Sequence, residues 1–178
     1  MLAKKAHLQK APDSSRAQIL ESLKKVSLLS EIHNNDLALE AFSKLVTLVH
    51  FSSGHDIIRE GSEGGELFIL VKGNAAVYKA TPGGEPYKVA ILSGEKHVAF
   101  GEGGLIGSDQ RGASIRTEDA CDCLVINRPD FENFALEFPA WALPIYRRVA
   151  QSVMIRLRKS NDDMLLLYNA LVAEIRGS

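Results

Sequence analysis

The stretch FGEGGLIGSDQRGAS, residues 100–114, holds the residues best suited to ligand chemistry in this chain. Its glycines have no Cβ, so the backbone there can approach a bound group closely. Arg111 adds a planar cation whose fork of N–H donors matches a phosphate or a carboxylate. Glycines and one arginine in this arrangement predict a phosphate-binding turn, but they do not say which phosphate is bound.

Composition and charge narrow the class of protein. The chain has 178 residues, 46% of them hydrophobic, and a formal net charge of −1. These values are typical of one globular domain with an extension, and they give no basic excess of the kind that nucleic-acid binding requires. No apolar signal segment and no run of eighteen apolar residues is found, so we expect neither secretion nor a membrane span.

The two cysteines, Cys121 and Cys123, alternate in the strand-like run ACDCLVIN and therefore face one side of it. No second Cys or His pair has the spacing of a metal-binding finger. We expect both thiols to lie in the core of a cytoplasmic protein, where a reducing environment keeps them free.

The order of hydrophobic patterns predicts an α+β protein. Residues 1–14 are interpreted as a mobile leader, followed by a helix from Ser15 to about Lys25 and a second helix from Asn35. Short β-rich runs separated by turns then predict an antiparallel β-roll of the jelly-roll kind. These runs are VTLVHF (46–51), IIRE (57–60), ELFILVK (66–72), AAVYKA (75–80), PYKVAIL (86–92), GASIRT (112–117) and ACDCLVIN (120–127).

Helical patterns return from Asp130, with a short helix and then a long one from about Ile145 to Ile175. The long helix carries a seam of alternating three- and four-residue steps, which is the heptad pattern of a coiled coil. Its members are Tyr146, Ala150, Val153, Leu157, Ser160, Met164, Leu167 and Leu171. We expect this 146–171 seam to form a parallel homodimer. The alternative is that the helix packs only on its own roll.

A second apolar stripe on the long helix, formed by Ile145, Val149, Leu165, Tyr168 and Val172, is available for packing on the roll. The predicted division of the chain is a leader at 1–14, a β-roll with flanking helices at 15–138, and a C-terminal lid and dimerisation helix at 139–178.

Three motifs carry a resemblance to a known family. FGEGGLIGSDQRGAS follows the pattern F-G-E-x-A-L, a short spacer and R-x-A-[ST] without a gap. FSSGHDIIREGSEGGELFILVKG precedes it and LVINRPDFENFALEFPAW follows it, each in the expected place. The chain therefore resembles cyclic nucleotide-binding domains of the catabolite activator protein and protein kinase regulatory-subunit type, over about residues 17–170.

The resemblance implies a role for each cassette residue. Arg111 would bind the exocyclic oxygens of a cyclic phosphate, backbone amides of the turn from Gly101 to Leu105 would bind the same group, and Glu102 would accept the ribose 2′-OH. The implied ligand-binding residues of the cassette are Gly101, Glu102, Gly103, Gly104, Leu105, Arg111, Gly112 and Ala113.

The long helix adds a second half-site, because the stretch from Arg156 to Asn161 resembles the helix that contacts the purine in the activator protein. Ser160 would bond the base in its own chain, and Asn161 would reach across the dimer. The alternative is that Ser160 is a small residue tolerated on the seam.

The cassette departs from the family pattern at its glycines. Gly103 and Gly104 replace the usual Leu/Ala pair, which predicts a looser cradle with a larger ordering cost. Gly112 lacks the hydroxyl of the cGMP-preferring pattern, which favours cAMP over cGMP and leaves a cyclic dinucleotide open.

Two other classes of function are an enzyme and an interaction module. An enzyme on a small barrel needs clustered His and Glu ligands, whereas the five histidines here are scattered and no His-x-His occurs, so we expect no catalytic or metal site. An interaction module that keeps the fold without binding nucleotide remains open. The preferred hypothesis is a stand-alone sensor, without a DNA-binding domain, that signals through its C-terminal helix to an unidentified downstream protein.

Overall fold

The structure is a computed structural model and describes residues 13–107 and 110–177. Most of the predicted leader lies outside the described residues, and its last two positions belong to helix α1 (Asp13–Lys24). A short 3₁₀ turn η1 (Ser27–Leu29) and helix α2 (Asp36–Ser43) follow. The side chain of Asn35 accepts a hydrogen bond from the Ala38 N–H at 3.0 Å and so caps α2, which begins one residue after the predicted start at Asn35.

The strands form two four-stranded antiparallel sheets, in the orders β1-β8-β3-β6 and β2-β7-β4-β5. Their bounds are β1 Thr47–Phe51, β2 Asp56–Ile58, β3 Glu66–Lys72, β4 Asn74–Lys79, β5 Tyr87–Ser93, β6 Ala99–Phe100, β7 Ser114–Thr117 and β8 Cys121–Asn127. The predicted α+β architecture, a β-roll flanked by helices, is confirmed.

Strand β6 is the element that the sequence patterns miss. It has two residues, too few to show a period of two, and it forms only because Phe68 of β3 pairs with Phe100. The two rings stack with centroids 5.3 Å apart. This pairing matters for the site because β6 delivers the chain directly into the glycine-rich turn η3 (Glu102–Leu105).

The core has two parts. One lies under the helices and includes Phe42 and Phe131, and the other lies between the sheets and includes Leu70 and both cysteines. Cys121 and Cys123 are completely buried and free, as predicted for core residues. Burial raises the pKa of the Cys121 thiol to about 11, so this thiol is protonated and unreactive at neutral pH.

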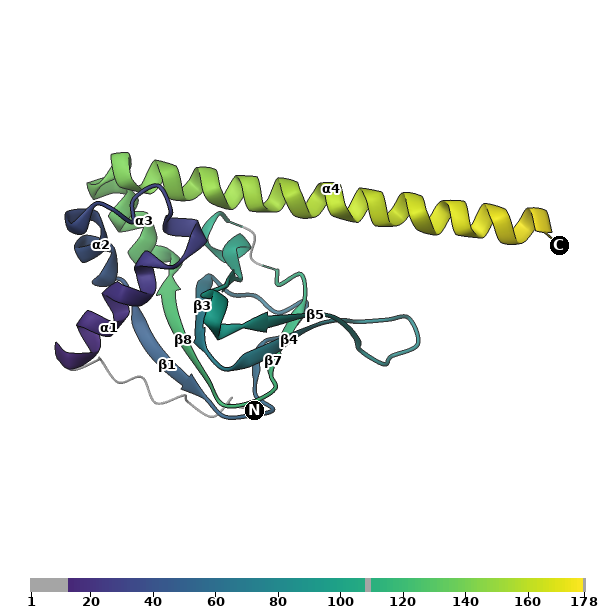
Figure 1. Cartoon of the computed structure of the whole chain (residues 1–178), viewed down its shortest axis with the longest axis horizontal. Helices are drawn as coiled ribbons and strands as arrows, with labels where there is room; N and C mark the ends of the chain where they lie inside the picture. Colours follow the sequence, from purple (N-terminus) through teal and green to yellow (C-terminus); the bar gives the residue numbers. More distant parts are fainter. Residues whose placement is uncertain (1–12, 108–109, 178) are drawn as a thin grey trace.

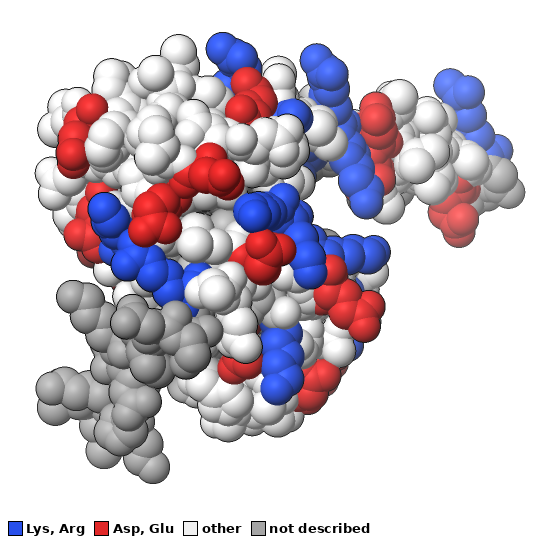
Figure 2. All heavy atoms as spheres, turned by 60° about the vertical axis from the view of Figure 1, so that its left-hand side comes forward, with Lys and Arg blue, Asp and Glu red and all other residues white. Residues whose placement is uncertain are grey.

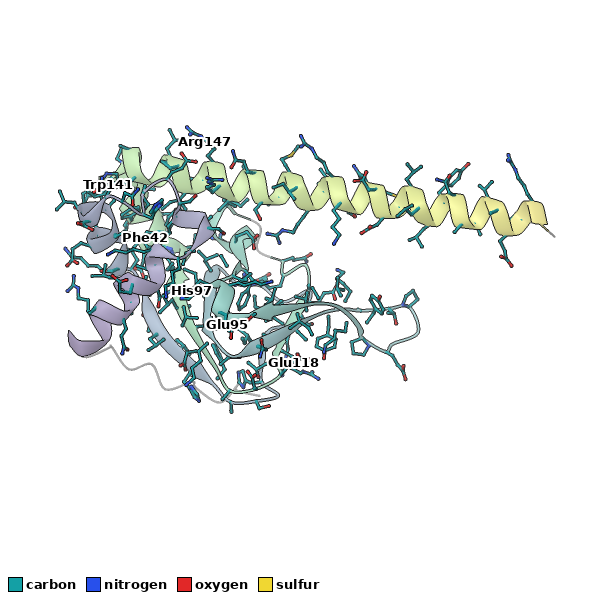
Figure 3. The ribbon with its side chains drawn as sticks, in the orientation of Figure 1. Phe42, Glu95, His97, Glu118, Trp141 and Arg147 are labelled. Carbon is teal, nitrogen blue, oxygen red and sulfur yellow. The ribbon has the colours of Figure 1, made fainter. Side chains whose placement is uncertain are left out.

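Helix α3 (Arg128–Glu137) leads into α4 (Pro139–Gly177), which starts well before the predicted Ile145. Pro139 holds the first position of α4, where a missing N–H is tolerated. Figure 1 shows α4 covering the helical end of the roll and then projecting far beyond it, on the same side as the β4–β5 hairpin. Figure 3 places Trp141 near Phe42, where α4 begins, and Arg147 further along the helix.

The second apolar stripe on α4 behaves differently from the prediction. Ile145 and Val149 are buried against the helical core, but Leu165 and Tyr168 are 58% and 62% exposed. Only the first part of the stripe packs on the roll, because α4 projects beyond the roll toward its C-terminus.

Charged side chains are mixed over the visible surface. Figure 2 shows Lys and Arg interspersed with Asp and Glu on one face, as a near-neutral net charge implies. None of the helices in the described ranges is both long and apolar enough to cross a membrane.

Candidate functional site

A cavity of about 940 Å³ lies between the roll and the first half of α4. Its floor comes from the turn η3 and the start of β7, its side from β4 and β5, and its cover from α4 and η1. Its lining includes Glu102, Arg111, Gly112, Arg148, Ser152 and Arg156. The lining is mostly apolar with a few convergent polar groups, which is the usual character of a small-molecule site.

Arg111 is the buried cation of this cavity, with only 7% of the residue exposed. It donates from Nη1 to the Gly101 carbonyl at 2.9 Å and from Nη2 to Glu66 Oε2 at 2.8 Å. Its guanidinium also lies 5.9 Å from the ring centre of Phe68. These contacts use two of five N–H donors and fix the group in place, so it is preorganised for an anion.

The glycines around Arg111 are required by close packing. A Cβ added to Gly101 would lie 2.8 Å from Arg111 Nη1, and one added to Gly64 would lie 2.8 Å from Nη2. Gly101 also has a φ of +75°, which other residues adopt only with strain. At Gly104 the added Cβ would lie 3.0 Å from Nη1. An alanine at Gly104, the usual residue of the family pattern, would therefore make a tight contact with the guanidinium.

Two further cations hold the cassette from outside the cavity. Arg128, at the start of α3, donates from Nε to the Gly104 carbonyl at 2.5 Å. Lys79, at the end of β4, donates to the Gly112 carbonyl at 2.5 Å. The backbone of this glycine-rich turn is thus fixed by neighbours that its own sequence does not contain.

Glu102 connects the turn to the long helix. It is buried, with 7% of the residue exposed, and its carboxylate forms an ion pair with Arg156 of α4. Arg156 also donates from Nη2 to Ser152 Oγ at 3.0 Å. Burial lowers the pKa of Arg156, but an arginine starts so high that it stays protonated. The pair closes α4 over the cavity.

Most of the cassette residues proposed from the sequence lie together. Seven of them line the cavity, namely Gly101, Glu102, Gly103, Gly104, Arg111, Gly112 and Ala113. Leu105 belongs to the same turn, but its side chain lies in the helical core with 2% exposed. Ser160 and Asn161 are exposed on α4, one turn beyond Arg156, and are not among the cavity-lining residues of this chain.

The sequence reasoning missed the residues by which α4 faces the cavity. Arg148, Ser152 and Arg156 follow one another at four-residue steps, so they share one face of the helix. That spacing was visible in the sequence, but nothing there shows which face of α4 meets the roll. Ser27 and Leu28 of η1 also line the cavity and carry no recognisable signal.

The described residues hold no cluster of three or more His, Cys, Asp or Glu side chains that could bind a metal. A mostly apolar cavity with the buried Arg111 guanidinium, a carboxylate and a glycine-rich turn is suited to a small organic anion on a β-roll. The sequence profile of the cyclic nucleotide-binding domain matches residues 48–138, just over half of the chain. The chain therefore belongs to the cyclic nucleotide-binding domain family.

The similarity to curated relatives covers most of this chain but only a small part of each relative. Human cGMP-dependent protein kinase 2 is 37% identical over 111 residues, which are 61% of this chain and 14% of the kinase. A Drosophila melanogaster cGMP-dependent protein kinase, isozyme 2 forms cD5/T2, is 31% identical over 118 residues, which are 65% of this chain and 12% of that protein.

Solved structures share the fold. A cyclic nucleotide-binding domain from Methylobacillus flagellatus superposes with a TM-score of 0.71 at 21% identity, covering 86% of this chain and 84% of that one. The Thermus thermophilus catabolite activator protein gives 0.68 at 21% identity, covering 80% and 63%. The regulatory domain of Toxoplasma gondii PKA, solved with cAMP, gives 0.63 at 21% identity, covering 78% and 51%.

Proposed function

We propose that this chain is a sensor of cyclic mononucleotides that binds cAMP in preference to cGMP and acts by binding, not by catalysis. The observation that carries the proposal is the buried Arg111 guanidinium, fixed by Glu66 and the Gly101 carbonyl in the cavity wall. A cyclic phosphate has one negative charge and no terminal phosphate. One preorganised guanidinium together with backbone amides is matched to that group.

The preference for cAMP is supported by Gly112. A glycine offers no hydroxyl at the position where the cGMP-preferring pattern has Thr, and a Cβ there would meet no described neighbour within 4 Å. The cGMP-dependent kinases among the relatives make cGMP the competing ligand, so both nucleotides belong in one experiment.

The roles of Glu102 and α4 are assigned from their positions at the cavity. Glu102 accepts the ribose 2′-OH, and α4 covers the base. Since Ser160 and Asn161 lie outside the cavity of this chain, their proposed contacts with the base depend on a shift of α4 or on a second copy. The part of the 146–171 seam from Leu157 onward supports a parallel homodimer, because Leu157, Leu167 and Leu171 are 51%, 72% and 59% exposed. Tyr146, at the start of the seam, packs on Phe131 with ring centroids 5.2 Å apart and belongs to the chain's own helical core.

Signalling follows from the ion pair between Glu102 and Arg156. A ribose hydroxyl that donates to Glu102 competes with Arg156, the residue through which Glu102 holds α4 in place. The position of α4 then changes if the ligand has different affinities for the protein in its two helix positions. A downstream protein that reads α4 or the dimer surface completes the pathway. The two free buried thiols fit a reducing compartment such as the cytoplasm.

Titration calorimetry with cAMP, cGMP and cyclic di-GMP tests the proposal, alongside Arg111→Ala. We expect cAMP to bind most tightly and the variant to lose about 100-fold or more in affinity, because a buried charge pair with the phosphate is removed. Arg116→Ala is the matched control, since Arg116 lies on β7 and pairs with Asp56 at 2.6 Å on the exposed side of the sheet.

Absence of heat with all three nucleotides from a folded protein would contradict the sensor. It would favour the second candidate, a module of this fold that binds other proteins and no nucleotide. The observation that favours this candidate is that Glu102 already has a partner in Arg156.

A further inference from the structure

Lys79 lies at the end of β4, outside the cavity, and contacts the cassette through the backbone. Its ammonium donates to the Gly112 carbonyl and to Glu60 Oε1, both at 2.5 Å. Lys79 is not a cavity-lining residue, whereas Gly112 and Ala113 are. The side chain therefore reaches the binding turn from behind.

Glu60 fixes the position of Lys79. Its Oε2 accepts the Ala80 N–H at 2.8 Å, and its own N–H donates to Ser114 Oγ at 2.9 Å. The hydrogen bonds from Lys79 and Ala80 lower the pKa of Glu60, so the carboxylate is charged at neutral pH. Glu60 thus links the end of β4, through Lys79 and Ala80, to the start of β7, through Ser114.

Gly112 lacks the side-chain packing found at Gly101 and Gly104. An added Cβ would meet Arg111 at those two glycines, whereas at Gly112 it would have no heavy atom within 4 Å apart from the glycine itself and its two chain neighbours. The residue before it is anchored, because the Arg111 carbonyl accepts the Gly61 N–H at 2.8 Å. A glycine loses more backbone freedom on ordering than any other residue, so an unsupported one weakens a binding turn.

We propose that Lys79, anchored by Glu60, is a positioning residue that orders the Gly112–Ala113 peptide for the ligand. A trans peptide is planar, so a Gly112 carbonyl held toward Lys79 turns the Ala113 N–H in the opposite direction. Lys79 does not touch the ligand and acts through Gly112. The effect on affinity rests on the proposed nucleotide function, but the ordering of the peptide does not.

Lys79→Met tests the inference because it keeps the aliphatic stem and removes the ammonium. We expect the affinity for cAMP to fall about three- to tenfold, the size of one charge-assisted hydrogen bond that acts indirectly. Lys88→Met is the matched control: Lys88 lies on the neighbouring strand β5, pairs with Glu118 and has a similarly exposed side chain, 42% against 48% for Lys79. It should leave affinity unchanged.

Rescue by Gly112→Ala separates positioning from a general structural role. Gly112 does not have a positive φ and has room for a Cβ, so alanine fits there. Alanine also restricts the range of backbone conformations at this position without help from Lys79. The Lys79→Met/Gly112→Ala double variant should recover about two- to fivefold of the lost affinity. A loss that this change does not recover would overturn the inference.

Hydrogen exchange of the Ala113 amide in the ligand-free chain gives a reading that needs no nucleotide. Lys79→Met should speed this exchange relative to the wild type and to Lys88→Met, and Gly112→Ala should slow it again. Equal exchange in the two methionine variants would overturn the role of Lys79. If no nucleotide binds to the wild type, the proposed function fails, and the exchange data still decide whether Lys79 orders the peptide.

Discussion

The two halves of α4 have the same kind of sequence and different surroundings. In the first half, Ala142, Ile145 and Val149 are each 1% exposed, and the half ends at Arg156 in its ion pair with Glu102. In the second half, Leu166 and Leu167 are 68% and 72% exposed, although they are as apolar as the buried residues. The apolar pattern continues along the helix, but the contact with the roll does not.

The two halves of α4 therefore have separate roles. Its first half belongs to the folded domain and closes the cavity. Its second half keeps most of its large apolar side chains exposed in the described chain, so it gains little stability from packing on the roll. The exposed leucines and methionines of the second half are explained if a second copy of the chain covers them. The two halves can therefore be tested separately.

Breaking the dimer seam should have the largest effect. Leu167→Asp places a charge in the proposed interface of both copies and removes two buried leucines, so we expect the dimer dissociation constant to rise about a thousandfold. Sedimentation equilibrium measures the change. Leu166→Asp is the control, because Leu166 is equally exposed but lies off the seam, and the same loss in both variants would contradict a heptad interface.

Truncation in the first half should destabilise the domain itself. Ile145→Ala removes a fully buried side chain and should lower the free energy of unfolding by about 2–4 kcal/mol, whereas Leu165→Ala should lower it by less than about 0.5 kcal/mol. Urea unfolding in the Leu167→Asp background keeps association out of the measurement. Comparable losses would mean that the second half also packs on the roll.

The boundary between the halves can be located at Arg156. A double-mutant cycle with Arg156→Gln and Glu102→Gln should give a coupling free energy of about 1 kcal/mol, because Glu102 is buried while the Arg156 side chain is 60% exposed. The same cycle with Arg158→Gln should give none, since Arg158 lies in the exposed half. Coupling of Glu102 to Arg158 would place the boundary between the two halves of α4 beyond Arg156.

The smallest effect is expected at the outer face of the first half. Arg147 donates to Glu31 at 3.1 Å and is more than half exposed, so Arg147→Ala should lower the free energy of unfolding by about 0.5 kcal/mol or less. This loss should disappear in 1 M salt, where exposed charges are screened. A loss that persists in salt would show that the aliphatic stem, and not the charge, holds α4 there.

Local patterns were sufficient for most of the fold and for the cassette. Alternating strands, the helix near Asn35 and the two core cysteines were readable because period and burial pattern depend on neighbours in the sequence. Seven residues of the gapless cassette line the cavity. The two-residue strand β6 was not readable, because its only signal is the pairing of Phe100 with a residue far away in the chain.

The family, the antiparallel roll and the glycine-rich turn with its arginine follow from the amino-acid sequence alone. The face of α4 that meets the roll follows only from the folded chain, and with it the contact of Arg156 with Glu102 and the position of Ser160 and Asn161 outside the cavity. The contacts of Arg128 and Lys79 with the glycine carbonyls of the cassette also follow only from the folded chain. The physical reason is that helix periodicity specifies a face but not its partner, which is set by packing between segments that are distant in the sequence.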